Sequence, residues 1–370
     1  MVISEKMTAV VKVAPSAGIE GTEVREVAVP SPGPGEVLVK VVATAICGTD
    51  RHIYNWDPSI QRAVAPPRTY GHEFCGEIAS LGPSPGRSDL REGDYVSCEM
   101  HVVCGTCYQC RNGQGHICKN TKILGLHGDG CFAHYVAVPA SNVIHLERSV
   151  PPRIGAFLDA LGNAVHTTQV ADLSGRSVAV LGFGPIGAMC ASIAELSGAS
   201  RIYVTDVSDA ALAMAASWKE RRGLDGVRIF DLRKAAPSDL LATVRDETYG
   251  GVDVVLELSG AESAINLGLE MVKNGGFLSL LGLTKGNDVT IAGYSKNVIF
   301  KGVTLKWIIG RQMYGTWYKM LDLLKSGLDV GYVVTHEYED LGRFHEALEL
   351  LNGGKAMKIV FYPHGRPEKR

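Results

Sequence analysis

Four cysteines lie close together in the segment CGTCYQCRNGQGHIC, with two, two and seven residues between successive members: Cys104, Cys107, Cys110 and Cys118. Thiolates are soft ligands that suit zinc, and four of them around one ion form a common structural site. Such a site is closed, because it has no vacant coordination position, so the ion cannot carry out chemistry itself. We therefore predict a structural zinc lobe at about residues 98–122 and a catalytic centre elsewhere.

Two other interpretations of the four cysteines carry less support. A redox-active CxxC pair or a disulfide knot would use the same residues, but disulfides are rare in a reducing cytosol. A zinc ribbon that binds nucleic acid would need a basic surface. Only Arg111 and Lys119 are basic nearby, and the whole chain has a formal net charge of -2. Neither nucleic acid nor an anionic membrane is therefore an expected partner.

A glycine-rich segment, GFGPIG, follows an apolar run and opens an alanine-rich one; its residues include Gly182, Gly184, Pro185, Ile186 and Gly187. Glycines with this spacing allow a tight turn and close approach of backbone N–H groups to a pyrophosphate at a helix N-terminus. Asp206 ends the next apolar run, where a carboxylate accepts hydrogen bonds from the adenosine ribose and repels a 2′-phosphate. A glycine turn used only for packing would not predict that acid, so we expect a site for NAD rather than NADP.

Three further segments contain residue types that ligate metals. AICGTDRHIYNWD includes Cys47, YGHEFCG includes His72 and Glu73, and FLDALGNAVHT includes Asp159. A sulfur, a nitrogen and an oxygen ligand would suit a catalytic zinc that keeps one position open. A lone histidine or a buried cysteine is more often simply packed, so the residues by themselves leave both interpretations open.

The chain changes character along its length. At 370 residues it exceeds one ordinary hydrophobic core, whose growth stops at roughly 250–300 residues. Up to about residue 146, β-branched stretches alternate with glycine and proline, which is typical of a mainly β domain with long loops. Beyond residue 150, apolar strands alternate with helical lengths, which indicates an α/β domain with a parallel sheet covered on both faces.

Across nearly the whole chain the sequence resembles the zinc-dependent medium-chain dehydrogenase/reductase family, and within it the branch that oxidises L-threonine. The motifs that carry the resemblance are ICGTDRHIYNWD, GHEFCG, the four-cysteine segment, LGNAVHT, the glycine fingerprint and GRQMYGTWY. The resemblance implies a GroES-like, mainly β catalytic domain at 1–162 and a doubly wound Rossmann domain at 163–308. A C-terminal segment at 309–370 is expected to return to the catalytic domain, and the active site is expected in the cleft between the domains.

The resemblance also implies roles for individual residues. Cys47, His72 and Asp159 look like ligands of a catalytic zinc, with Glu73 as a neighbouring or exchanging ligand. Thr49 and His52 match a relay that carries a proton through the cofactor ribose to solvent. Glu99 and His101 match a pair near the substrate, where Glu99 would face the substrate ammonium. The expected cofactors are NAD and two zinc ions per chain, and the expected assembly is a homotetramer.

The expected activity is oxidation of a secondary alcohol, and the resemblance implies L-threonine as the substrate and 2-amino-3-oxobutanoate as the product. A dehydrogenase of polyols or butanediol is the nearest alternative, because it would share fold, zinc and cofactor sites. A non-enzymatic nucleotide-binding protein is a further alternative, which the retained Cys47, His72 and Asp159 disfavour. The N-terminus lacks the features of a secretory signal, and the apolar run at 178–196 is broken by glycines and Pro185, so we expect a cytoplasmic protein without a membrane span.

Overall fold

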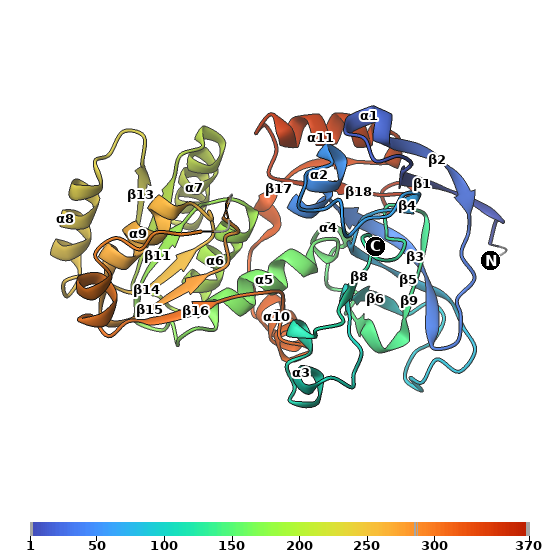
Figure 1. The fold of residues 1–370 in the computed structure, drawn as a ribbon, viewed down its shortest axis with the longest axis horizontal. Coiled ribbons are helices and arrows are strands. Elements are labelled where there is room, and N and C mark those ends of the chain that lie inside the picture. Colours follow the sequence, from blue (N-terminus) through green and yellow to red (C-terminus); the bar gives the residue numbers. More distant parts are fainter. Residues whose placement is uncertain (1–2, 285, 287, 368–370) are drawn as a thin grey trace. The chain divides into compact units, whose positions relative to one another are not determined.

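The computed structural model describes residues 3–284, 286 and 288–367 (Figure 1). The chain divides into two compact units, one made of Met1–Ala160 with Val334–Arg370 and the other of Leu161–Val333. Our sequence boundaries after residues 162 and 308 remain a prediction, and the contacts place the return of the chain to the first unit later, at Val334. Among the described residues, none of the helices is long and apolar enough to cross a membrane.

The first unit is built mainly from β-strands. A seven-stranded sheet has the order β10-β6-β5-β3-β18-β17, with β9 paired to β3. Its strands are β3 (Glu36–Ala45), β5 (Glu73–Leu81), β6 (Tyr95–Cys98), β9 (Tyr135–Pro139), β10 (Val143–His145), β17 (Val334–Tyr338) and β18 (Lys358–Phe361). Two smaller sheets are formed by β1 (Lys6–Lys12), β2 (Thr22–Ala28) and β4 (Arg68–Thr69), and by β7 (His101–Val102) and β8 (Lys122–Ile123).

Alternating valines place the core of this unit on one face of β3. Val37, Val39 and Val41 are fully buried and pack with Phe74 of β5 in one apolar cluster, as expected for a strand whose side chains alternate between faces. The helices of the unit are short: α1 (Gly18–Gly21), α2 (Gly48–Asn55), α3 (Tyr108–Arg111), α4 (Pro152–Gly155) and α11 (Phe344–Asn352). The 3-10 turns are Gly115–Ile117, Ala140–Asn142 and Leu341–Arg343.

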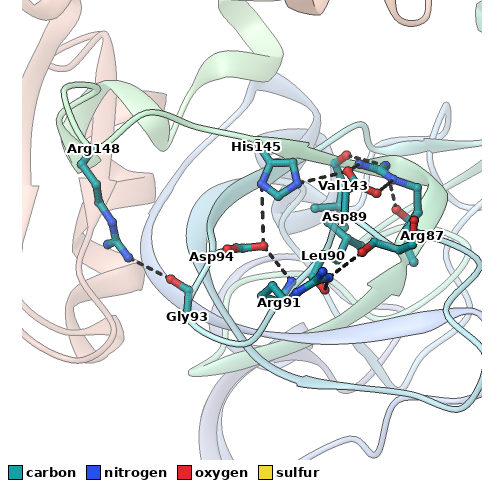
Figure 2. Close-up of polar contacts among 11 residues, drawn as sticks. Arg87, Asp89, Leu90, Arg91, Gly93, Asp94, Val143, His145 and Arg148 are labelled. Carbon is teal, nitrogen blue, oxygen red and sulfur yellow. Dashed lines mark hydrogen bonds and ion pairs between the residues drawn. The ribbon is translucent and has the colours of Figure 1, made fainter.

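A charged network fixes the loop between β5 and β6 against β10 (Figure 2). His145, the last residue of β10, lies 3.3 Å from Asp89 and 3.8 Å from Asp94 of that loop. Arg87 also pairs with Asp89, and its guanidinium donates to the carbonyl of Val143 at 3.3 Å. Exposed ion pairs each contribute little to stability, but together these contacts restrain the loop that leads into β6.

The second unit contains a six-stranded parallel sheet in the order β13-β12-β11-β14-β15-β16. Its strands are β11 (Ser177–Leu181), β12 (Arg201–Asp206), β13 (Val227–Asp231), β14 (Val252–Glu257), β15 (Val272–Leu280) and β16 (Thr304–Trp307). Its helices are α5 (Leu158–Thr168), which begins in the first unit, α6 (Pro185–Leu196), α7 (Asp209–Arg222), α8 (Pro237–Glu247), α9 (Glu262–Met271) and α10 (Gly315–Lys325). A π-helical turn spans Ser295–Ile299, and a 3-10 turn spans Gly331–Val333.

Helices cover both faces of the parallel sheet (Figure 1). Helices α6 and α7 pack on β11, β12 and β13, whereas α9, with α8 beside it, packs on β11, β14 and β15. The strand order reverses between β11 and β14, and ligands of such sheets bind outside the carboxyl ends of the strands at this point. The predicted fold class, a mainly β domain with a doubly wound α/β domain, is confirmed.

Candidate functional site

Cys47, His72 and Glu73 come together in the first unit. One ligand atom from each lies within 4.8 Å of the others. Cys47 follows β3 and is the N-cap of α2, whereas His72 and Glu73 lie at the start of β5, which pairs with β3. The antiparallel pairing therefore brings the three side chains to one place, although about 25 residues separate Cys47 from His72 in the sequence.

The buried atoms of this cluster fit a metal ion. Among the described residues, neither ring nitrogen of His72 has a hydrogen-bond partner, and the same holds for Oε1 of Glu73. Both side chains are almost completely buried, and a buried polar atom without a partner costs free energy that a metal bond would remove. A thiolate, an imidazole and a carboxylate form a donor set that zinc accepts. The residues present thus fit a zinc ion.

The electrostatics of the cluster also favour a cation. Burial alone would lower the pKa of His72. The negative charges of Asp50 and Cys47 outweigh this effect and raise the pKa from 6.5 to about 10. Asp159, near the start of α5, is buried as well. Burial raises the pKa of Glu73, and the charge of Asp159 also raises the pKa values of Glu73 and His72. The oxygens of Asp159 are not in the group of atoms within 4.8 Å, so its role as a zinc ligand stays a prediction.

Two buried residues that we did not predict support the cluster. Asp50 Oδ2 accepts a hydrogen bond from the backbone N–H of Cys47 at 2.8 Å, and Oδ1 lies 3.7 Å from His72 Nδ1. Lys358 of β18 donates to Glu73 Oε2 at 2.6 Å and to the carbonyl of Ile46 at 3.0 Å. Burial lowers the pKa of Lys358, but the negative charges around it, chiefly that of the hydrogen-bonded Glu73, together outweigh this effect, so the pKa is raised. A lysine within the apolar strand KIVF was the signal that could have identified it.

Helix α2 carries the two predicted relay residues on one face. Thr49 Oγ1 lies 3.8 Å from the sulfur of Cys47, and His52 follows three residues later, which is the spacing of neighbours on a helix surface. His52 Nδ1 contacts Asp57 Oδ2 at 2.5 Å, and the His52 side chain is 44% exposed. Helix α2 therefore has Thr49 beside the metal cluster and His52 at the solvent-exposed surface. Asp57 was not predicted, although it lies in the same sequence segment.

Glu99 and His101 form a buried pair in the first unit. Glu99 Oε1 accepts hydrogen bonds from the backbone N–H of His101 at 2.9 Å and from its Nδ1 at 2.7 Å. Asn142, which we did not predict, donates to the carbonyls of both residues. Glu99 is completely buried, and its carboxylate is placed to orient the His101 ring. The contact of Glu99 with a substrate ammonium stays a prediction.

The four clustered cysteines form a compact thiol group. Their sulfurs lie 3.5 Å apart for Cys107 and Cys110, 3.7 Å for Cys107 and Cys118, and 3.6 Å for Cys118 and Cys104. A tetrahedron with zinc–sulfur bonds of about 2.3 Å has edges of about 3.8 Å. Donation from the backbone N–H of Thr106 lowers the pKa of Cys104 to about 5, which favours the thiolate. The residues fit a zinc ion, whereas sulfurs at these separations are not disulfide-bonded.

The glycine fingerprint lies between β11 and α6 at the carboxyl end of the parallel sheet. Gly182 has a φ of 93°, in the left-handed region, and Gly184 is the N-cap of α6. A Cβ at Gly187 would overlap the carbonyl oxygen of Gly182, so only glycine allows this close turn. Pro185 and Ile186 form the first turn of α6, where the missing N–H of proline costs no helical hydrogen bond.

Asp206 ties the end of β12 to this turn. Its Oδ2 accepts from the backbone N–H of Phe183 at 2.6 Å, and its Oδ1 accepts from those of Val207 and Ser208. Oδ2 therefore keeps a further acceptor position, which can accept a hydrogen bond from a ribose hydroxyl.

Glu257, which we did not predict, lies fully buried at the end of β14 and holds the neighbouring turn. Its Oε1 accepts from the backbone N–H and the hydroxyl of Ser259, and from the N–H of Gly260. The Ser259 backbone lies so close to Gly182 that a Cβ on that glycine would come 3.1 Å from it. The nucleotide turn is therefore braced by β14 as well as by β12.

Comparison with known proteins identifies the family. The alcohol dehydrogenase GroES-like domain matches residues 33–148, and the zinc-binding dehydrogenase domain matches residues 185–326. The L-threonine 3-dehydrogenase of Pyrococcus horikoshii is 44% identical over 361 residues, which cover 97% of this chain and 99% of the relative. This chain belongs to the zinc-binding dehydrogenase family. The family predicted from the sequence motifs is thereby confirmed.

Solved structures similar to this dehydrogenase include alcohol dehydrogenases with the same two-domain fold. An alcohol dehydrogenase from Thermus sp. ATN1 has a TM-score of 0.84 and 31% identity, with 96% of this chain and 100% of that chain covered. A zinc-binding dehydrogenase from Sinorhizobium meliloti 1021, bound to NADP, has a TM-score of 0.82 and 26% identity, with 97% and 100% covered.

Proposed function

We propose that this dehydrogenase oxidises the 3-hydroxyl of L-threonine to give 2-amino-3-oxobutanoate, with NAD as hydride acceptor. The observation that carries the proposal is the 44% identity to an L-threonine 3-dehydrogenase over 97% of the chain, a span that includes Cys47, His72 and Glu73. Zinc, when bound, supplies a Lewis acid that lowers the pKa of an alcohol hydroxyl. NAD, when bound, supplies the acceptor for the hydride of the carbinol carbon.

In this proposal the ligand cluster holds and orients the metal. Cys47 and His72 are ligands, together with Asp159, and Lys358 fixes the Glu73 carboxylate beside them. Two zinc ions per chain are expected, with the second in the closed four-cysteine group. That second ion stabilises the lobe and takes no part in the reaction.

The proton of the substrate hydroxyl leaves through side chains of α2. Thr49, next to Cys47, accepts it, and His52 exchanges it with solvent, where its half-exposed ring meets water. Asp57 orients the His52 ring through Nδ1 and leaves Nε2 for the exchange. His101 binds the amino-acid part of the substrate, and hydrogen bonds from His101 to Glu99 and from Asn142 to the His101 carbonyl hold it in place.

We propose NAD rather than NADP because Asp206 ends β12 at the glycine turn, where its negative charge opposes a 2′-phosphate. The similar dehydrogenase from Sinorhizobium meliloti was solved with NADP, so both cofactors belong in the test.

The deciding experiment is a substrate panel with the purified, zinc-loaded protein. L-Threonine, sorbitol, 2,3-butanediol and ethanol are each assayed with NAD and with NADP by the absorbance of the reduced cofactor. We expect the highest kcat/KM for L-threonine with NAD. A preference for sorbitol or 2,3-butanediol would instead favour a dehydrogenase of polyols or diols, and no turnover of any alcohol would contradict the enzyme assignment.

We also propose that the protein is a cytoplasmic homotetramer. All nine cysteines are free, as expected in a reducing compartment. Strand β16 lies at one end of the parallel sheet, and large apolar side chains in and around it are exposed, including Phe300 at 79% and Trp307 at 70%. An edge strand with exposed aromatic side chains nearby favours pairing with another chain, and a second copy of this chain is the partner that we propose.

A further inference from the structure

Arg233 lies beside the proposed adenosine-ribose site, with its guanidinium bound by two carboxylates. Its Nε and Nη2 donate to the two oxygens of Asp231 at 2.9 and 2.8 Å, and Nη2 also contacts Asp209 Oδ1 at 2.5 Å. The fork of the guanidinium is thereby engaged in the geometry that it would offer to a phosphate. These hydrogen bonds lower the pKa values of both Asp231 and Asp209.

The fold places these residues next to Asp206. Asp206 and Asp231 are the last residues of β12 and β13, and they are direct partners in the parallel register. The backbone N–H of Leu232 also donates to the carbonyl of Asp206 at 3.1 Å. Asp209 begins α7, three residues after Asp206, and Arg233 follows Asp231 by two. The salt bridges of Arg233 therefore connect the two loops that border Asp206.

We propose that Asp209 and Asp231 contribute to the preference for NAD over NADP. They bind the Arg233 guanidinium and so prevent it from binding the 2′-phosphate of NADP. The inference rests on the proposed binding of NAD. Specificity of this kind comes from an element that disfavours the wrong ligand. Lys234 lies 3.4 Å from Asp231 and is the second cation beside Arg233. The three carboxylates of Asp206, Asp209 and Asp231 outnumber these two cations, so the local charge is negative. The 2′-phosphate of NADP would bring about two more negative charges to this place.

The test uses the full-length, zinc-loaded protein and the dissociation constants of NADH and NADPH from fluorescence titration. In the double variant Asp209→Asn/Asp231→Asn the guanidinium is released, and we expect NADPH to bind about tenfold more tightly, with little change for NADH. Addition of Arg233→Met should return the NADPH affinity to that of the wild type. Asp246→Asn, which removes an exposed charge from α8 of the same unit, is the matched control and should change neither constant.

A single variant keeps the test independent of folding. Asp209 has a side chain that is 85% exposed, so Asp209→Asn alone leaves the strand end intact and should tighten NADPH binding by about threefold. Unchanged NADPH affinity in both variants would overturn the inference, and so would a gain that survives Arg233→Met, because loss of negative charge alone would then explain it. Failure of the wild type to bind NADH would instead contradict the proposed function itself.

Discussion

The ammonium of Lys358 lies 2.6 Å from the carboxylate of Glu73, and both side chains are buried. The two residues are 285 positions apart in the sequence and meet because β18 pairs with β3, which pairs with β5. A buried ion pair costs desolvation energy when formed, but removal of one partner leaves a charge without compensation. A substitution that removes either Lys358 or Glu73 is therefore expected to destabilise the fold around this cluster.

Replacement of Lys358 by methionine tests this expectation. We expect the free energy of unfolding of Lys358→Met to fall by about 3–5 kcal/mol, because Glu73 keeps a buried charge without its partner. Chemical denaturation measures the change. Lys355→Met, three residues earlier and exposed, is the matched control and should lie within about 0.5 kcal/mol of the wild type. If the two variants had equal stability, the proposed importance of the pair would be wrong.

Lys12 predicts a dependence of stability on pH. Its side chain is buried, with Nζ bonded to the carbonyl of Ser16 at 2.5 Å and 4.9 Å from the Trp56 ring, and burial lowers its pKa from 10.5 to about 8. Between these values the unfolded chain binds more protons than the folded one, so the contribution of Lys12 to stability increases as pH rises from 8 to 10.5. Below pH 8 the full cost of burying the charge remains.

Denaturation midpoints of the wild type and Lys12→Met, measured across this pH range, should reveal the effect. The wild type should gain stability relative to Lys12→Met as pH rises. Lys6→Met, at the exposed start of β1, serves as the control and should show a constant difference from the wild type. A difference between wild type and Lys12→Met that does not vary with pH would contradict the lowered pKa.

Substitution of different cysteines should affect the two proposed zinc sites separately. Cys107→Ser should lower thermal stability and remove one zinc per chain, because the closed thiolate site holds that part of the chain together. Cys47→Ser should abolish turnover while NADH binding and the other zinc persist. Zinc content is measured by elemental analysis, with Cys190→Ser, a buried cysteine of α6, as the control that keeps both ions. Full activity of Cys47→Ser, or an unchanged zinc content of Cys107→Ser, would refute the respective site.

His52→Gln tests the exit of the proton. We expect kcat to fall by about 10- to 100-fold with unchanged zinc content, because no group on α2 then exchanges the proton with solvent. Added imidazole should restore part of the rate, an effect that a purely structural role would not produce. His336→Gln, on β17 of the same unit, should leave kcat and its pH profile as in the wild type. A normal pH profile in His52→Gln would exclude the relay.

Trp307→Lys tests the proposed association through β16. A charge in place of the exposed indole should shift the protein to smaller species at equal concentration, because the apolar contact would be lost and like charges would meet across a symmetric interface. Light scattering after size-exclusion chromatography gives the molar mass. Tyr249→Lys, at an even more exposed aromatic residue after α8, is the control. Identical masses for both variants and the wild type would remove β16 as an interface.

The parts of the site that are contiguous in sequence were predictable. The four cysteines lie within fifteen residues, and the glycine turn is determined by local backbone geometry, so spacing alone indicates both. Cys47, His72 and Glu73 required the resemblance to a known family, because only the pairing of β3 with β5 brings them together.

The residues that support the site were not predictable, because their roles depend on tertiary contacts. Asn142 lies more than forty residues from Glu99, and its amide acts through two backbone carbonyls that no sequence pattern identifies. Glu257 resembles an ordinary acid at a strand end until its bonds to Ser259 and Gly260 are seen. The same holds for Arg233, whose partners follow from the register of β12 and β13.

The insertion of β18 between β3 and β17 has a consequence for synthesis of the protein. During translation, β3 and β5 leave the ribosome long before β18, and the whole second unit is made in between. Until Lys358 emerges, the nascent chain has an unpaired flank on β3 and a Glu73 carboxylate without its counter-charge. Maturation of the metal cluster is therefore expected only after Lys358 has emerged, whereas the four-cysteine lobe has all of its thiols early enough to capture its ion co-translationally.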